Sequence, residues 1–139
     1  MPGANAPGML ALMGGMTTPP AYSPPPAPAP MSPSDEKLWA TLIHLSGIVF
    51  PLWGALIGYF VLKDRGPFVR QHVTEAFNFQ LSLTIYSVAV GVLSVITLGF
   101  GAFLFIPLGI VALVFMIMAA VAANRWQQYS YPLTLRLIK

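Results

Sequence analysis

The sequence predicts an all-α integral membrane protein with three transmembrane helices and an interfacial helix between the first and the second. Three observations predict this class. Only 8% of the 139 residues are charged, whereas soluble domains carry about 25%, and residues 76–124 contain no charged side chain. The mean hydropathy is +0.72. Because about 20 apolar residues cross a bilayer core of about 30 Å as a helix, the uncharged stretch is long enough for two crossings.

Residues 1–33 are expected to form a disordered, proline-rich tail, and residues 34–139 to form the helical membrane domain. The tail carries no charge and contains Pro24-Pro25-Pro26, followed by alternating alanine and proline to Pro30. Such a composition favours extended polyproline II structure and does not build a core. We interpret the tail as a spacer, and the alternative is a ligand for a proline-binding groove.

The first span is expected over residues 38–62. Ser34 can cap its start, and Asp35 and Glu36 in the first turn complement the positive end of the helix dipole. Pro51 lies near the middle of this segment and is expected to kink the helix, which membrane helices tolerate. The alternative is that Pro51 reverses the chain and makes two re-entrant half-helices.

A polar connection, residues 63–75, follows the first span. Gly66 and Pro67 end one helix and begin the next, because proline suits the first helical position. Residues 68–75 are expected to form the interfacial helix and residues 76–98 the second span. A short uncharged turn at residues 99–101 then leads into the third span, residues 102–123.

The basic residues predict the orientation. With three crossings, the 63–75 loop and the C-terminal tail share one side of the membrane and hold Lys63, Arg65, Arg70, Arg125, Arg136 and Lys139, whereas Lys37 alone lies on the other side. Cytoplasmic loops carry the excess of Lys and Arg. We therefore predict a multi-pass protein of the bacterial cytoplasmic membrane with its N-terminal tail outside and its C-terminus in the cytoplasm. A reversal at Pro51 would move the N-terminal tail to the cytoplasm.

Each predicted span carries a stripe of small or polar residues at steps of three and four. The stripes are His44, Gly47, Pro51, Gly54 and Gly58; Gln80, Thr84, Ser87, Gly91 and Ser94; and Gly109, Ala112, Met116, Ala119 and Ala123. Small residues let membrane helices approach closely, and polar ones bond between helices. We expect these stripes to pack within one chain, and the alternative is a homo-oligomer through the GxxxG pair of Gly54 and Gly58.

Only His44 is ionisable within a predicted span, and such a residue is a functional hypothesis by default. A structural hydrogen bond to a serine, a glutamine or a backbone carbonyl is the favoured interpretation, because no acid or second histidine accompanies His44 inside the membrane. A proton relay or a metal ligand is the alternative.

The richest polar cluster holds Arg70, His72, Glu75, Asn78 and Gln80. We expect Glu75 to pair with Arg70 or to cap local amides where the helix meets the headgroups, and Asn78 and Gln80 to bond between helices. No nucleophile–base pair or carboxylate pair is evident, so the sequence predicts no enzyme and no catalytic residue.

No cofactor is predicted, and the absence of cysteine excludes thiolate metal sites. The pI of 9.5 arises from basic residues at the ends of apolar segments. This arrangement indicates contact with lipid headgroups rather than with nucleic acid.

Several motifs resemble a known family. They are Trp39-Ala-Thr-Leu-Ile-His44-Leu-Ser-Gly47, Pro51-Leu, Phe68-Val-Arg70-Gln-His72, Glu75-Ala-Phe-Asn78-Phe-Gln80 and Tyr131-Pro-Leu-Thr-Leu-Arg-Leu-Ile-Lys139. Over residues 35–139 the chain resembles a bacterial family of small membrane proteins of unknown function that is similar to the Tic-twenty component of chloroplast protein import. The resemblance implies an all-helical membrane domain in membrane protein complexes, and it implies no catalytic residues.

We therefore expect a non-enzymatic accessory or packing subunit of a larger membrane complex, for which respiratory complexes are one setting. Its partners are the lipid bilayer and other integral membrane proteins. The first alternative is a translocation or insertion factor, which would need a polar groove with Gln80, Thr84 and Ser87 facing it. The second alternative is a small proton-coupled carrier that uses His44.

Overall fold

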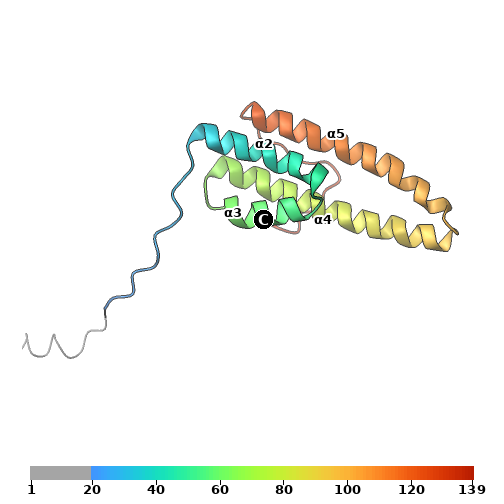
Figure 1. Cartoon of the computed structure of the whole chain (residues 1–139), viewed down its shortest axis with the longest axis horizontal. Coiled ribbons are helices and arrows are strands. Elements are labelled where there is room, and N and C mark those ends of the chain that lie inside the picture. The colour runs from blue at the N-terminus through green and yellow to red at the C-terminus, as the bar shows by residue number, and fades with distance from the viewer. Residues whose placement is uncertain (1–19) are drawn as a thin grey trace, which may run out of the picture.

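The computed structural model describes residues 20–139, and within this part of the chain all regular structure is helical (Figure 1). The elements in order are α2 (Pro33–Val49), α3 (Trp53–Leu62), α4 (Pro67–Ile96), the 3₁₀ helix η1 (Phe100–Leu104) and α5 (Phe105–Asn124). Residues 20–32 contain no regular secondary structure. The first nineteen residues of the predicted disordered tail lie outside the described residues.

Helix α2 begins two residues earlier than the predicted cap requires. Pro33 occupies the first turn, and the side chain of Ser32 accepts a hydrogen bond from Asp35 N at 3.3 Å. Proline at this position lacks only an N–H that would have no helical partner. The N-cap is therefore Ser32, and the prediction of Ser34 is wrong.

Pro51 reverses the chain, so the prediction of one span over residues 38–62 is wrong. Helix α2 ends at Val49, Leu52 takes a positive φ of 64°, and α3 starts at Trp53 and runs back along α2. A Cβ atom on Gly54 would lie 2.6 Å from Ser46 Oγ, and one on Gly58 would overlap the Ile43 side chain. These two glycines thus let α3 pack closely on α2 of the same chain.

Two helical segments are long and apolar enough to cross a membrane, namely α4 and residues 100–124. The prediction of three spans is therefore not supported. Helix α3 has ten residues, which at 1.5 Å per residue reach about 15 Å, or half of a bilayer core of about 30 Å.

The predicted interfacial helix is part of a longer helix. Helix α4 runs from Pro67 to Ile96 without a break, so residues 68–75 and the second span form one element of 30 residues. Pro67 stands at its start, where its fixed φ favours the helix. The separate helix between the first and second spans is therefore a wrong prediction.

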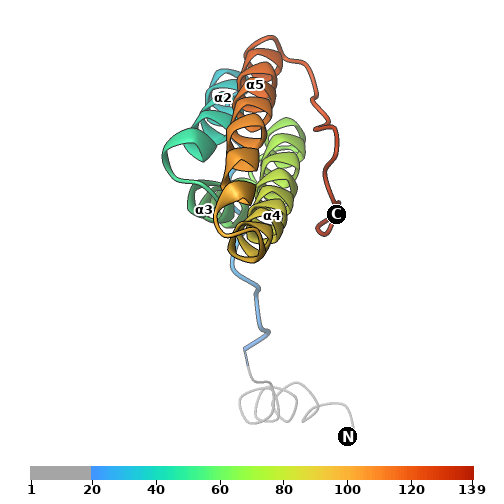
Figure 2. The same ribbon diagram turned by 90° about the vertical axis from the view of Figure 1, so that its right-hand side faces the viewer.

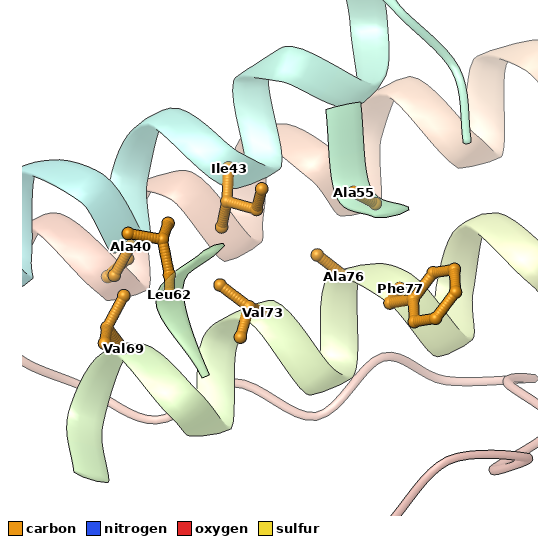
Figure 3. Packing of buried hydrophobic residues seen from close by; sticks show 9 residues of the cluster. Ala40, Ile43, Ala55, Leu62, Val69, Val73, Ala76 and Phe77 are labelled. Carbon is orange, nitrogen blue, oxygen red and sulfur yellow. The ribbon is translucent and has the colours of Figure 1, made fainter. Parts of the chain in front are cut away.

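The hairpin packs against one half of the long helices. Helix α2 lies along α5 and also contacts α4, while α3 packs on α4; α4 and α5 extend past the hairpin and are joined through η1 (Figures 1 and 2). The buried apolar residues at the centre are Ala40 and Ile43 of α2, Ala55 and Leu62 of α3, and Val69, Val73, Ala76 and Phe77 of α4 (Figure 3).

The segment before α2 and the loop after α3 lie at the same end of the bundle. Met31 N donates to Arg65 O at 3.0 Å, and Arg65 Nε donates to Ala29 O at 2.8 Å. Both pairs place the chain before α2 beside the 63–66 loop. This contact does not fit a topology in which the N-terminal tail and the loop lie on opposite sides of a membrane.

Candidate functional site

The C-terminal segment, residues 127–139, lies along one face of α4 (Figure 2). Six side chains of α4 hold this segment by hydrogen bonds, and we call them the polar seam. They are Gln71, His72, Glu75, Asn78, Ser82 and Tyr86. Most of these positions follow one another at steps of three or four, which places them on one face of the helix. The seam therefore arises from the helical repeat of α4.

The seam supplies partners for backbone groups that have no neighbouring strand. The Asn78 amide pairs with both polar groups of Ile138, donating to its carbonyl at 2.7 Å and accepting from its N–H at 2.8 Å. Ser82 Oγ accepts from Leu135 N at 2.8 Å, and Tyr86 Oη donates to Leu133 O at 2.6 Å. Unpaired backbone groups cost several kcal/mol in an apolar environment. The seam thus allows an extended segment to lie against a membrane helix.

Glu75 joins the same segment by a hydrogen bond and an ion pair. Its Oε2 atom accepts from Tyr131 N at 3.0 Å and pairs with Arg136 Nη2 at 3.3 Å. The expected pair with Arg70 is wrong, since Arg70 is exposed and the partner comes from 61 positions along the chain. Asn78 likewise bonds to the C-terminal segment and not between helices.

A buried chain of hydrogen bonds crosses from α2 to the C-terminal segment. Tyr131 Oη lies 2.8 Å from His44 Nδ1, His44 Nε2 lies 2.8 Å from His72 Nδ1, and His72 Nε2 lies 2.9 Å from Gln127 O. A carbonyl only accepts, so His72 Nε2 carries a proton and, in the neutral ring, Nδ1 accepts from His44 Nε2–H. His44 Nδ1 then accepts from the Tyr131 hydroxyl. Every polar atom in the chain is paired with both rings neutral.

The histidine chain is closed to solvent. His44 and His72 are 1% and 0% exposed, and the Tyr131 ring stacks on Phe79 with centroids 4.1 Å apart. Burial, with Tyr129 and Glu75 nearby, raises the pKa of the Tyr131 hydroxyl, which keeps it a donor. This geometry suits a fixed structural link between α2, α4 and the C-terminal segment, since no reactant can reach the rings.

His72 is the partner that sequence reasoning missed. We expected no second histidine beside His44, and His72 was assigned to the headgroup region. The two are 28 positions apart, on different helices, and the fold brings their rings within hydrogen-bond distance. No local pattern signals this pair, because it depends on the reversal at Pro51 and on how α2 packs on α4.

Gln80 holds the tip of the helical hairpin. Its Oε1 atom accepts from Leu52 N at 3.2 Å, and its Nε2 atom lies 3.4 Å from the Met116 sulfur of α5. A Cβ atom on Gly47 would overlap the Gln80 amide, so Gly47 leaves the space that this side chain needs. Pro51 at the tip has no N–H to satisfy. Gln80, Gly47 and Pro51 together explain how the backbone polar groups at the chain reversal are accommodated among apolar helices.

The part of the α4 stripe that lies beyond the hairpin tip, toward the C-terminal end of α4, lines an open cleft. The cleft lies between α4 and α5 beyond the hairpin tip, has a volume of about 430 Å³, and includes Thr84 and Ser87 with Gly109 opposite. A Cβ atom on Gly91 or Gly109 would meet nothing within 4 Å. The stripes therefore pack within the chain near the hairpin and remain unpacked beyond it.

The remaining basic positions lie either at the end of the bundle where α4 begins or on the C-terminal segment farther along α4, beside Glu75 and Asn78. Lys63 Nζ lies 5.5 Å from the Tyr59 ring centroid, and Arg125, Arg136 and Lys139 are exposed after the end of α5. Within residues 20–139 no three His, Asp or Glu side chains converge in a way that could hold a metal ion. The polar groups of the site serve hydrogen bonding between segments.

Comparison with known proteins identifies a family. The sequence model of the magnetosome magnetite crystal formation protein family (MamF/MmsF) matches residues 35–138, which covers the described helices except the first two residues of α2. No curated protein and no solved structure matches the chain. The assignment to a family similar to the Tic-twenty component is therefore wrong, because the matching family is a different one.

Proposed function

This chain belongs to the magnetosome magnetite crystal formation protein family, and from that premise we propose that it is a non-enzymatic protein of a magnetosome membrane that supports the formation of magnetite crystals. The two apolar helices α4 and η1–α5 support its place in a membrane. The closed hydrogen-bond networks around His44 and Gln80 support a role without catalysis, because their polar groups are used within the fold.

We propose a topology of two crossings and one re-entrant hairpin. Cytoplasmic segments carry the excess of Lys and Arg, so this topology has the end of the bundle where α4 begins in the cytoplasm. Met31, before α2, and Arg125, after α5, both lie at this end. The opposite end is the turn from Thr97 to Leu104, which contains no charged residue. In this orientation the face toward the interior of the magnetosome has no carboxylate with which to bind iron.

The protein therefore acts on crystal formation through other membrane proteins, as an accessory or packing subunit. The observation that carries this proposal is the family match together with the uncharged distal turn. The unpacked cleft beside Thr84, Ser87 and Gly109 leaves a helix-sized face for a partner within the membrane. Iron in proteins is commonly bound by carboxylate and imidazole groups, and the turn from Thr97 to Leu104 has neither.

The test is complementation in a magnetite-forming bacterium that lacks its own member of this family. Expression of this chain is expected to restore crystal size in electron micrographs and to place the chain in the isolated magnetosome membrane. A Tyr131→Phe variant removes the hydroxyl of the histidine chain but keeps the ring on Phe79; it is expected to lower stability but, at equal amounts in the membrane, to restore crystals equally well. Normal amounts of the chain in that membrane without any change in crystal size would refute the proposal.

Single cysteines test the topology, since the chain has none of its own. With two crossings, Tyr22→Cys and Asp64→Cys are expected to react with an impermeant maleimide from the same, cytoplasmic side. Leu98→Cys, in the exposed distal turn, is expected to react from the opposite side. Labelling of positions 22 and 64 from opposite sides would restore the topology of three crossings.

The geometry supports the two alternative functions less well. A proton-coupled carrier would need access to His44, whose ring nitrogens are both bonded inside the fold. An insertion factor would need a polar groove with Gln80, Thr84 and Ser87 facing it. All three line the open cleft, but Thr84 donates to Gln80 O and the Gln80 amide bonds to Leu52 N, so two of the three are engaged within the fold. We therefore retain the accessory role as the single proposal.

A further inference from the structure

A second groove runs along the outer side of the helical hairpin, between α2 and α3. It has a volume of about 460 Å³, and its lining is almost entirely apolar. Gly54 and Gly58 line it from α3, where their lack of a side chain lets α2 approach closely. Ser46 also lines it, but its hydroxyl donates to Ile43 O at 2.7 Å and is already satisfied. The groove therefore favours a hydrocarbon chain over a polar ligand.

The groove is about one leaflet deep. It extends from Arg65 at its mouth to Gly54 near the hairpin tip, a distance of about 15 Å along α3 at 1.5 Å per residue. Half of a bilayer core of about 30 Å is the same length. A lipid acyl chain in the cytoplasmic leaflet would match this depth, whereas a helix crossing the whole membrane would extend well beyond it.

The mouth of the groove carries a positive charge at the level of the headgroups. Arg65 Nε donates to Ala29 O, and this bond holds the side chain at the mouth; within residues 20–139 its two terminal nitrogens make no hydrogen bond. Glu36 lies beside Gly66 and accepts from Val69 N at 2.9 Å, and among residues 20–139 no carboxylate lies within 4 Å of the Arg65 guanidinium. Trp39, also at the mouth, belongs to the residue type enriched at membrane interfaces. Guanidinium groups bind phosphate through two parallel hydrogen bonds.

We propose that this groove binds one anionic phospholipid, with its acyl chain between α2 and α3 and its phosphate on the Arg65 guanidinium. The positive charge of Arg65 complements an anionic headgroup, and the depth of one leaflet matches an acyl chain. Both features favour a lipid over a membrane-crossing helix as the occupant. The inner faces of Gly54 and Gly58 already contact α2, so they are not free for a glycine-mediated contact with a second copy. This site is independent of the proposed role in crystal formation.

The test uses the full chain, purified in mild detergent from membranes that contain phosphatidylglycerol, with bound lipid counted by native mass spectrometry. Wild-type protein is expected to retain one phosphatidylglycerol and to prefer it over phosphatidylcholine. Arg65→Gln is expected to lower this preference about fivefold, the effect of one basic side chain at an anionic headgroup layer. Arg65→Lys keeps the charge and is expected to retain most of the preference, while Arg70→Gln, at an exposed position of α4, is the matched control.

Steric block provides the second arm of the test. Val61→Trp places a large ring in the groove from an exposed wall position and is expected to remove the bound lipid, whereas Val92→Trp, on an exposed site of α4 outside the groove, should leave it in place. Equal lipid retention by all variants would show only annular lipid and overturn the proposal. Disulfide-linked dimers of an Ile57→Cys variant would also overturn it, because a second copy would then occupy the groove.

Discussion

Replacing His72 by leucine is expected to destabilise the protein by roughly 2–6 kcal/mol and to release the C-terminal segment from α4. The change leaves the His44 Nε2–H and the Gln127 carbonyl without partners in a buried setting, and each such group costs about 1–3 kcal/mol. The measurement is unfolding in detergent, followed by circular dichroism, together with the rate of tryptic cleavage at Arg136. Faster cleavage with earlier unfolding is the expected result.

A double-mutant cycle separates the histidine link from general loss of packing. His44→Leu and His72→Leu are expected to show a coupling of about 1–3 kcal/mol, because the second substitution removes a polar group that the first had already left unpaired. Arg70→Leu changes an exposed residue of the same helix and is expected to alter stability by less than about 0.5 kcal/mol. Strictly additive effects of the two histidine substitutions would contradict the hydrogen-bonded pair.

Gly101→Ala is expected to destabilise the protein by about 1–3 kcal/mol through overpacking. Gly101 is buried in the turn where η1 meets α4, and a Cβ atom there would lie 2.8 Å from Ser94 N and 2.9 Å from Leu93 C. These contacts are with backbone, so no side chain can rotate away, and η1 would have to separate from α4. Detergent unfolding midpoints measure the effect.

Gly109→Ala is the matched control for the turn. A Cβ atom on Gly109 would meet nothing within 4 Å, and the residue lies within α5. Alanine is favoured over glycine in a helix by about 0.8–1.0 kcal/mol, so this variant is expected to be as stable as the wild type or more stable. If both substitutions had the same effect, the close approach of η1 to α4 would be refuted.

Local patterns predicted the long helices well. The uncharged stretch of residues 76–124 and the glycines at 99 and 101 indicated two apolar segments joined by a short turn, and the structure has α4, η1 and α5 there. These features can be predicted from the sequence because hydropathy and glycine content are properties of a single segment and do not depend on distant residues. The end of a helix is less certain, as the shift of the N-cap from Ser34 to Ser32 illustrates.

The reversal at Pro51 could not be chosen from the sequence. A kinked span and a re-entrant pair of half-helices have the same hydropathy, so this property favours neither. The reversal is stable because Gln80, 28 positions away on α4, accepts the hydrogen bond from Leu52 N, and because Gly47 leaves room for its amide. Backbone groups inside a membrane need such partners, and a partner on another helix is visible only in the tertiary structure.

The sequence by itself determined that this is a helical membrane protein, where its two long apolar helices lie, and that its charges gather at their ends. These properties depend on composition and on neighbours within a turn or two of helix. Only the tertiary structure decided the chain reversal at Pro51, the pairing of His44 with His72, and the attachment of the C-terminal segment to α4. Those features are hydrogen bonds between residues tens of positions apart, and they exist only once the helices have packed.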